Sequence, residues 1–396
     1  MSEAVLRLKR NEERRLKAGH LWVFSNEVDV QATPLAGLEP GQAVRIEAAG
    51  GQPIGMGYVN PRSLICARLM ARDVRRALDA DLLMHRLQSA LALRTRLFSE
   101  PCYRLVYGES DALPGLVVDR YGDVLVGQIT TAGMERLKPL LTELLQTLLA
   151  PRALVWRNDG PLRALEGLPA YSETAFGEVA GLALAENGVR FELDLDTAQK
   201  TGWFYDHRLN RARLQAYVKD MKVLDLFSYV GGWGVQAAAF GAREVLCVDA
   251  SGPAVAQVAH NARLNGVERR VSARQADAFE ALKALRAERA RFDVVILDPP
   301  AFIKRKKDLK EGTLAYQRLY HAALGVLEQD GILVAGSCSY HLPRERLPQL
   351  LGQAARPLGR HLQILEQGHQ GPDHPVHPAI PETDYLKAAI ARAVVG

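Results

Sequence analysis

The sequence predicts an α/β fold whose C-terminal part is a doubly wound sheet. Three short apolar runs, at residues 223–227, 292–297 and 331–335, have the composition of buried parallel strands. The first run opens into a glycine-rich loop, the second ends in Asp-Pro-Pro at 298–300, and the third leads to Gly-Ser-Cys-Ser at 336–339. Because parallel strands end at one edge of such a sheet, where ligands bind, a cofactor and a nucleophile would share one cleft there.

Composition limits the class of protein. The chain has 396 residues, which is too long for one ordinary core, so two or three domains are expected. No apolar run approaches the roughly 18 residues that span a membrane, and the N-terminus lacks an apolar signal core, so we expect a cytoplasmic protein. The four cysteines show no metal-like spacing, which fits a reducing compartment. The net charge of +5 is a weak indication of a polyanionic partner.

Residues 1–72 have the pattern of a small β-rich domain. Its expected strands lie at residues 44–47, 53–58 and 64–69. Basic residues crowd its start, among them Arg14 and Arg15. They could contact RNA, or they could form the solvated face of a small barrel, and the charge pattern leaves both interpretations open.

Residues 73–178 are predicted to form a small α+β domain. Its expected helices lie at 79–98 and 134–149, and its expected strands lie at 116–126 and 153–157. The segment 116–126 holds two strands, because the Tyr-Gly-Asp sequence inside it is typical of a tight turn.

The third predicted domain comprises residues 179–396. It begins with Asn187-Gly188 between two alternating runs, which is a strong signal for a hairpin with a type I′ turn. From about residue 200, strand-like and helix-like segments alternate to the end, and the last expected strand lies at 385–391.

Residues 225–234 read Asp-x-Phe-x-x-x-Gly-Gly-x-Gly and resemble the first motif of Rossmann-like S-adenosylmethionine-dependent methyltransferases. Asp225 at the strand end can hold the ammonium of the methionine moiety, and the glycines let the backbone approach a ligand closely. Asp249 ends the next strand, where its carboxylate can bind both ribose hydroxyls. Asp277 follows at the place where the exocyclic amine of adenine would lie.

A nicotinamide dinucleotide is the rival cofactor. Its binding normally requires Gly-x-Gly-x-x-Gly directly after the first strand, with no acid at position 225. The loop of this chain does not match that pattern. Three acids at successive strand ends are a stronger signal together than any one alone, so we expect S-adenosylmethionine.

Asp298 and Cys338 are the candidate catalytic residues. Asp-Pro-Pro after a strand fits methyltransferases that act on a nitrogen or a carbon of a base. Amine methylation usually requires an aromatic residue directly after the second proline, where this chain has Ala301, with Phe302 one position later. Methylation of an amine is therefore the less favoured interpretation.

Methylation of cytosine carbon-5 would need a nucleophile from the protein. A thiolate that adds at carbon-6 turns the ring into an enamine, and Cys338 at a strand end supplies such a thiol. Asp298 could hydrogen-bond the pyrimidine edge. Alternatively, Cys338 is a small buried apolar residue, which is the commonest role of a free cysteine. We expect that structural role for the other three cysteines, which lie in or beside apolar runs at positions 66, 102 and 247.

Several motifs together resemble one family. They lie at residues 108–115, 199–208, 227–232, 298–302, 337–339 and 373–375. The chain resembles the PUA-containing cytosine-5 methyltransferases of bacterial large-subunit ribosomal RNA over essentially its whole length. The resemblance implies an RNA-binding PUA barrel at 1–72, a Rossmann-like methyltransferase domain at 179–396, S-adenosylmethionine as cofactor and 23S ribosomal RNA as partner.

The resemblance also implies the residues of the site, with Cys338 as the single nucleophile and Asp298 beside it. The implied cofactor-binding residues are Lys200, Phe204, Arg208, Asp225, Phe227, Ser228, Tyr229, Gly231, Gly232, Asp249, Ala250, Ser251, Asp277, Ala278 and Asp298. The chain departs from the family with His207 where glutamine is common and with Ala301 where lysine is common.

A basic run, Lys304, Arg305, Lys306 and Lys307, follows the Asp-Pro-Pro segment. A run of charged residues is usually a solvent-exposed surface. Because this run lies beside the predicted base-binding cleft, we instead expect it to contact phosphates of the RNA. A histidine cluster at 369, 374 and 377 has only Asp373 as an acidic neighbour and no cysteine, so we expect no metal site.

Three hypotheses follow. The first is an RNA methyltransferase that makes 5-methylcytosine in 23S ribosomal RNA through Cys338. The second is a base-amine methyltransferase in which Cys338 is inert. The third is a non-catalytic RNA-binding protein, against which the acids at 225, 249, 277 and 298 argue. The sequence leaves open the exact nucleotide, the assembly state of the acceptor and the formation of a homodimer.

Overall fold

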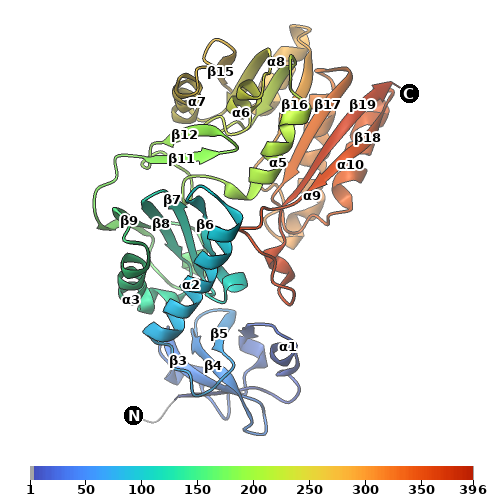
Figure 1. Ribbon diagram of the computed structural model, residues 1–396. Coiled ribbons are helices and arrows are strands. Elements are labelled where there is room, and N and C mark those ends of the chain that lie inside the picture. The colour runs from blue at the N-terminus through green and yellow to red at the C-terminus, as the bar shows by residue number, and fades with distance from the viewer. Residues whose placement is uncertain (1–3, 396) are drawn as a thin grey trace. The chain divides into compact units, whose positions relative to one another are not determined.

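The computed structural model describes residues 4–395, which form two compact units (Figure 1). The first unit extends to residue 182 and includes the later segments 198–203 and 372–383. The second unit contains 183–197, 204–371 and the chain from 384 on. The predicted division into domains at residues 72 and 178 stays a prediction, and two segments of the predicted third domain belong to the first unit.

The first unit contains two five-stranded sheets. One has the order β1-β3-β4-β5-β2, with the bounds Val5–Arg7, Gln42–Glu47, Pro53–Val59, Ile65–Ala71 and Trp22–Phe24. The other has the order β10-β9-β8-β7-β6, with the bounds Tyr171–Phe176, Ala153–Asn158, Val124–Ile129, Leu116–Tyr121 and Cys102–Tyr107. The helices are α1 (Arg14–Lys17), α2 (Ala80–Leu97), α3 (Ala132–Leu149) and α4 (Leu162–Leu165).

Local sequence explains these elements. The side chain of Asp79 caps α2 by accepting a hydrogen bond from Leu82 N at 3.1 Å. Gly122 has a φ of 63° in the turn between β7 and β8, which is the conformation that glycine tolerates best. The strands and helices expected in residues 44–158 are confirmed. Buried polar contacts also join the two sheets, since Tyr58 in β4 donates to the carbonyl oxygen of Pro114 at 2.7 Å.

Two motifs that are distant in the sequence meet in the first unit. The carboxylate of Asp111, from the 108–115 motif, receives two hydrogen bonds from the buried guanidinium of Arg94, at 2.6 and 2.7 Å. Arg94 also donates to the carbonyl oxygen of Asp373 at 2.8 Å. Both motifs therefore have a structural role, because they surround a buried charge that must be paired.

The second unit begins with a hairpin of β11 (Leu182–Glu186) and β12 (Val189–Leu193). Its two turn residues, Asn187 and Gly188, have φ values of 55° and 79°. Positive φ at both positions is the signature of the predicted type I′ turn.

A seven-stranded sheet follows in the order β15-β14-β13-β16-β17-β19-β18. Its strands are Val271–Gln275, Glu244–Asp249, Lys222–Leu226, Phe292–Leu297, Leu327–Ser337, Lys387–Val395 and Arg360–Gly368. The helices are α5 (Arg208–Arg213), α6 (Gly234–Ala239), α7 (Gly252–Leu264), α8 (Ala278–Ala287), α9 (Leu309–Leu324) and α10 (Arg346–Ala355). The predicted α/β class is confirmed, and among the described helices none is long and apolar enough to cross a membrane.

The last two strands were only partly foreseen. The strand expected at 385–391 is β19, but it runs antiparallel to β17, and β18 pairs with it as an antiparallel edge strand. No strand was expected at β18, because its side chains alternate between half-buried and exposed and form no apolar run.

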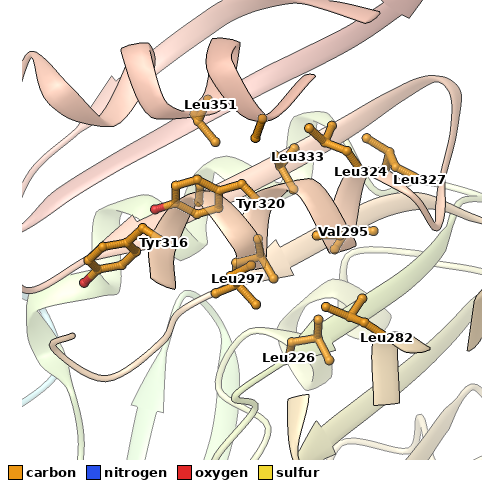
Figure 2. Packing of buried hydrophobic residues seen from close by; sticks show 14 of the residues in the cluster. Leu226, Leu282, Val295, Leu297, Tyr316, Tyr320, Leu324, Leu327, Leu333 and Leu351 are labelled. Atoms are coloured by element: carbon orange, nitrogen blue, oxygen red, sulfur yellow. The ribbon is translucent and has the colours of Figure 1, made fainter. Parts of the chain in front are cut away.

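The main core of the second unit lies between this sheet and α8, α9 and α10 (Figure 2). Leu226, Leu297 and Ala335 are neighbours in register, so their side chains point to the same face of the sheet. Tyr316 and Tyr320 of α9 pack onto this face. The alternate residues, including Asp225, point to the opposite face, where α6 packs against β13.

A buried ion pair holds the hairpin to the rest of the second unit. Glu186 at the end of β11 lies 2.5 Å from Arg211 Nε, and both side chains are almost completely buried. Gln236 of α6 donates to the same carboxylate at 2.9 Å. The pair therefore fixes α5 and α6 beneath the hairpin.

Replacing Glu186 by alanine should destabilise the protein by about 3–5 kcal/mol, because Arg211 would keep a buried charge without its partner. Urea unfolding followed by circular dichroism measures the change. The matched control is Glu192→Ala in the same hairpin, which removes the exposed pair with His260 and should cost less than about 1 kcal/mol. Equal losses in the two variants would contradict a structural role of the buried pair.

Candidate active site

Four strands of the second unit end at the same level. Leu226 of β13 is in register with Val248 of β14 and with Leu297 of β16, and Leu297 is in register with Ala335 of β17. The residues that follow these positions therefore share one edge of the sheet, as the sequence predicted. They are Phe227, Asp249, Asp298 and Gly336.

The loop after β13 has an unusual backbone. Phe227 and Tyr229 have φ values of 63° and 49°, a left-handed conformation that costs a non-glycine residue about 1–3 kcal/mol. Two hydrogen bonds hold it, from Ser228 N to the carbonyl oxygen of Val248 at 3.0 Å and from Tyr229 N to Asp249 Oδ2 at 2.8 Å. Backbone strain that is held in this way is a frequent feature of ligand-binding loops.

The glycines of the loop have a packing role. A Cβ on Gly231, whose φ is 88°, would lie 2.8 Å from Val235 Cγ2. A Cβ on Gly234 would lie 2.3 Å from the sulfur of Cys247. The backbone thus packs closely against its own sheet and helix, and at these two positions glycine is required for that reason. The neighbouring Gly232 is also buried.

Asp225 lies beneath this loop and is completely buried. Its Oδ2 accepts a hydrogen bond from Gly234 N at 2.8 Å, whereas its Oδ1 has no hydrogen-bond partner among the described residues. Burial raises the pKa of Asp225 well above its ordinary value, and the carboxylates of Asp298 and Asp249 raise it further. Three acids therefore crowd this edge, and a cationic ligand would relieve their repulsion.

Asp249 is half-buried at the end of β14 and orders two loops. Its Oδ1 accepts from Ser251 N at 2.9 Å, and its Oδ2 holds the loop at Tyr229. Each oxygen keeps a second lone pair, so the carboxylate can still accept hydrogen bonds from a diol. The ring of Phe204 packs edge-on against that of Tyr229, with centroids 5.6 Å apart.

The remaining predicted cofactor residues have varied surroundings. Asp277 is exposed and caps α8 by accepting from Phe279 N at 2.8 Å, so Ala278 is the first residue of that helix. Ala250 is exposed. Arg208 is buried, with its Nε 3.6 Å from Glu186. Lys200 is exposed in the 198–203 segment, which belongs to the first unit.

Two side chains contact the carboxylate of Asp298. His207 Nε2 lies 3.2 Å from Oδ1, and Trp233 Nε1 donates to Oδ2 at 3.0 Å. Burial raises the pKa of Asp298, but the two donors outweigh it and hold the pKa below its usual value. Asp298 is therefore fixed in orientation and kept ionised at neutral pH.

His207 is itself oriented by Asn210. Asn210 Nδ2 lies 3.1 Å from His207 Nδ1 and also donates to the carbonyl oxygen of His369 at 3.1 Å. Because the amide nitrogen faces Nδ1, the proton of the neutral ring lies on Nε2, toward Asp298. Burial lowers the pKa of His207, but the facing carboxylate of Asp298 raises it more, so the net pKa is raised.

Cys338 lies just beyond the end of β17, beside the Asp-Pro-Pro segment. Its Sγ is 4.0 Å from the carbonyl oxygen of Pro299, and the residue is half-buried. The other three cysteines are buried as expected, and burial raises the pKa of the Cys66 thiol to about 12. Burial also raises the pKa of the Cys247 thiol well above its ordinary value.

Polar side chains support the Cys338 loop. Ser339 Oγ accepts from Ile303 N at 3.1 Å and is 2.9 Å from Tyr316 Oη, which joins the loops that follow β16 and β17. Lys387 Nζ donates to the carbonyl oxygens of Ser339 and Tyr385, each at 2.7 Å. Burial lowers the pKa of Lys387 to about 8, and the charge of Cys338 acts in the opposite direction.

The predicted RNA-binding residues are on the surface. Lys304, Lys306 and Lys307 are exposed, and Arg305 is exposed but pairs with Asp308 at 3.1 Å. Arg14 is exposed as well. Arg15 instead pairs with Glu27 at 2.6 Å and lies over the ring of Phe24, so it is part of its own domain's framework.

Sequence reasoning overlooked three side chains at this edge. The sequence assigns no role to Trp233, which fills an unspecified position of the glycine-rich motif, or to His207, which appears only as a departure from the family pattern. Lys387 was not noticed, although a lysine inside an otherwise apolar strand is a signal that could have identified it. No grouping of metal-ligating side chains occurs in residues 4–395.

Replacing Asp249 by alanine should weaken S-adenosylmethionine binding at least about tenfold, because hydrogen bonds to a charged group are worth about 1.5–3 kcal/mol. Isothermal titration calorimetry measures the affinity. The matched control is Asp293→Ala, which removes a carboxylate that accepts from Lys222 N at the start of β13, away from the loop. Unchanged affinity in a folded Asp249→Ala variant would remove the residue from the cofactor site.

Known proteins resemble this chain over its whole length. Residues 171–388 match the S-adenosylmethionine-dependent methyltransferase family, and residues 6–72 match a PUA-like domain. The chain is 36% identical to ribosomal RNA large subunit methyltransferase I from Shewanella denitrificans, with 98% of each chain covered. It is 35% identical to the protein of the same name from Tolumonas auensis, again with 98% of each covered.

Solved structures share the fold. A protein from Streptococcus mutans, described as a SAM-dependent methyltransferase, is 19% identical with a TM-score of 0.81, covering 98% of this chain and 100% of that one. A methyltransferase complexed with SAH is 19% identical with a TM-score of 0.83 over the same shares. With its PUA-like N-terminal domain, this chain belongs to the S-adenosylmethionine-dependent methyltransferases, in the family of the ribosomal RNA large subunit methyltransferase I proteins.

Proposed function

We propose that this S-adenosylmethionine-dependent methyltransferase acts on 23S ribosomal RNA and methylates carbon-5 of a cytosine through a covalent adduct of Cys338. The observation that carries the proposal is the position of Cys338 Sγ, 4.0 Å from the carbonyl oxygen of Pro299, the residue that directly follows Asp298. The name of the curated relatives supports large-subunit ribosomal RNA as the substrate.

The proposed reaction begins at the sulfur of Cys338. Its thiolate forms a bond to cytosine carbon-6, and the electrons of the carbon-5 to carbon-6 double bond make carbon-5 nucleophilic. Bound S-adenosylmethionine would supply the methyl group to carbon-5, and the bond from the methyl carbon to the sulfonium sulfur would break, with its electrons left on the sulfur of S-adenosylhomocysteine. A proton then leaves carbon-5 to water, the double bond forms again, and the carbon–sulfur bond breaks to release Cys338.

Lys387 and Asp298 would assist in different ways. The Lys387 ammonium interacts electrostatically with Cys338, so it stabilises the thiolate relative to the thiol. Asp298 keeps a free lone pair on each oxygen although His207 and Trp233 occupy the others. It can therefore accept a hydrogen bond from the pyrimidine edge and favour a protonated nitrogen-3 during attack.

The edge of the sheet fits S-adenosylmethionine. The ligand carries a sulfonium and an ammonium, and Asp225, Asp249 and Asp298 crowd this edge with too few donors of their own. In the proposed arrangement, Asp249 binds the ribose hydroxyls and Asp277 lies near the adenine amine. Asp225 is buried beneath the loop and accepts from Gly234 N, so in this arrangement its carboxylate would hold the loop in place around the ligand.

Methylation of an exocyclic amine is less well supported. That reaction would need an aromatic ring free to stack on the target base. Phe302 packs instead against Tyr316, with ring centroids 4.8 Å apart, and belongs to the core beneath α9. The ring is therefore half-buried and engaged with Tyr316, which argues for the carbon-5 reaction.

Replacing Cys338 by serine should abolish methyl transfer to 23S ribosomal RNA but leave S-adenosylmethionine binding nearly unchanged. A serine hydroxyl is scarcely ionised near neutral pH, whereas a thiol with an ordinary pKa of about 8.5 supplies a usable thiolate fraction. Nucleoside mass spectrometry detects the product, and RNA containing 5-fluorocytosine should trap a covalent complex because fluorine cannot leave as a proton.

The control for this experiment is Cys102→Ala, which removes a buried thiol of the first unit and should leave the trapped complex intact. Normal turnover by Cys338→Ser, or a trapped complex that persists in it, would exclude covalent catalysis by this residue. Formation of a methylated exocyclic amine by the wild-type protein would establish the rival function.

Replacing His207 by alanine should move the acidic limb of the pH–rate profile to higher pH. The His207 contact lowers the pKa of Asp298, so its loss lets the carboxylate protonate at higher pH, and Asp206 and Arg211 nearby remain unchanged. Single-turnover methyl transfer measured from about pH 3 to about pH 8 gives the limb, since this range includes the ordinary pKa of an aspartate, about 3.9.

Two further variants make the pH experiment specific. His207→Gln keeps an N–H donor for Asp298 and should restore much of the wild-type profile. His260→Ala removes an exposed imidazole that pairs with Glu192 and should have no effect. An acidic limb that is the same in His207→Ala and in the wild type would mean that His207 does not tune Asp298.

A further inference from the structure

A groove of about 620 Å³ lies between α9 and α10 in the second unit. The two helices are packed side by side, and Figure 1 shows them on the same side of the C-terminal sheet. Four cationic side chains line the groove, and no carboxylate does. They are Lys306, Lys307, Lys310 and Arg346.

Helix periodicity explains how the groove forms. Lys310, Thr313, Leu314 and Gln317 recur at intervals of three and four residues, so they share one face of α9. A neighbouring face of α9 carries Tyr316 and Tyr320 into the core (Figure 2). The stripe that lines the groove is therefore left for another molecule or for solvent.

The cations of the groove lie outside the ion pairs of the described residues, although the charge of Lys307 acts on Asp308. None of the described ion pairs involves Lys306, Lys307, Lys310 or Arg346. Asp308, the acid nearest in sequence to the two lysines, pairs with Arg305 at 3.1 Å. The groove thus presents four positive charges to a ligand, which is the electrostatic footprint of a phosphate backbone.

The floor of the groove is partly apolar. Leu309 and Leu314 are 39% and 43% exposed, values that are high for leucine, and Leu342 and Pro343 lie opposite them. Aliphatic groups between cations suit the sugars and base faces of an extended nucleic-acid strand. No aromatic residue lines the groove, so stacking contributes little and phosphate contacts should dominate the affinity.

The groove is connected to both reactive residues. The η6 turn (Lys306–Asp308) and α9 follow the Asp298 loop directly, and Leu342 is four positions beyond Cys338. The hydrogen bond from Ile303 N to Ser339 Oγ ties the two loops together at 3.1 Å. A strand that lies in the groove would therefore pass next to the candidate catalytic edge.

We propose, on the basis of the function proposed above, that this groove binds a single-stranded RNA segment next to the methylated nucleotide. Its phosphates contact Lys306, Lys307, Lys310 and Arg346, and its sugars rest on the leucines of the floor. The residues of this surface belong to the second unit. The proposed surface includes two residues of the basic run, Lys306 and Lys307, and adds residues of α9 and α10. The sequence alone did not indicate that these two helices contribute to one surface.

The test uses the double variant Lys310→Ala/Arg346→Ala in the full chain, with protein-free 23S ribosomal RNA as the probe. Filter binding from about 50 to about 300 mM salt gives the dependence of log affinity on log salt. Loss of two phosphate contacts should lower the slope by about 1.4–1.8 and weaken binding. Calorimetry should show unchanged S-adenosylmethionine affinity.

The matched control is Lys283→Ala/Arg286→Ala, which removes the same charge from exposed positions on α8. It should retain the wild-type slope. A double groove variant with wild-type slope and affinity would overturn the inference. So would a variant that binds free RNA normally but fails only on assembled ribosomal particles, because the groove would then bind a protein.

The two proposals can fail separately. If the wild-type protein forms 5-methylcytosine but the groove variant binds RNA normally, only the groove inference is wrong. If the groove variant loses RNA binding while the wild type forms no 5-methylcytosine, the groove inference holds and the proposed product is wrong.

Discussion

The parallel register of β13, β14, β16 and β17 is the constraint on which the rest of the site depends. Because these strands are in register at their last buried residues, the loops that follow them begin at one level. Residues from four distant parts of the sequence therefore meet at one edge of the sheet. The core under α8, α9 and α10 fixes that register, since a slip by one residue would turn the buried leucines away from it.

Because these strand ends meet, several carboxylates lie at one edge of the sheet. Hydrogen-bond donors of the second unit balance their negative charge. Asp225 is bound to a backbone N–H and is otherwise buried, which disfavours its ionised form. Asp298 instead accepts from the ring N–H of Trp233 and faces the imidazole of His207, and both favour its ionised form. The surroundings of these two acids at adjacent strand ends thus shift their pKa values in opposite directions, which is a common way to divide binding and catalytic tasks.

Some features of the fold and of the site could be predicted from the sequence, and others could not. The hairpin at Asn187-Gly188, the strands with apolar runs and the position of Cys338 at a strand end all follow from local patterns, and the structure agrees with them. The edge strand β18 lacks such a pattern, because its partly exposed face has no apolar run. Asp225 was expected to face the ligand, whereas the structure buries it against Gly234.

The sequence by itself determined which elements form and which residues end the strands, because strand periodicity, turn residues and caps are encoded within a few positions. Only the tertiary structure decided what those residues contact. His207 and Trp233 meet Asp298, and Lys387 reaches the Cys338 loop, across separations in sequence that no local pattern records. The groove between α9 and α10 has the same origin, because its charges converge only when the two helices pack.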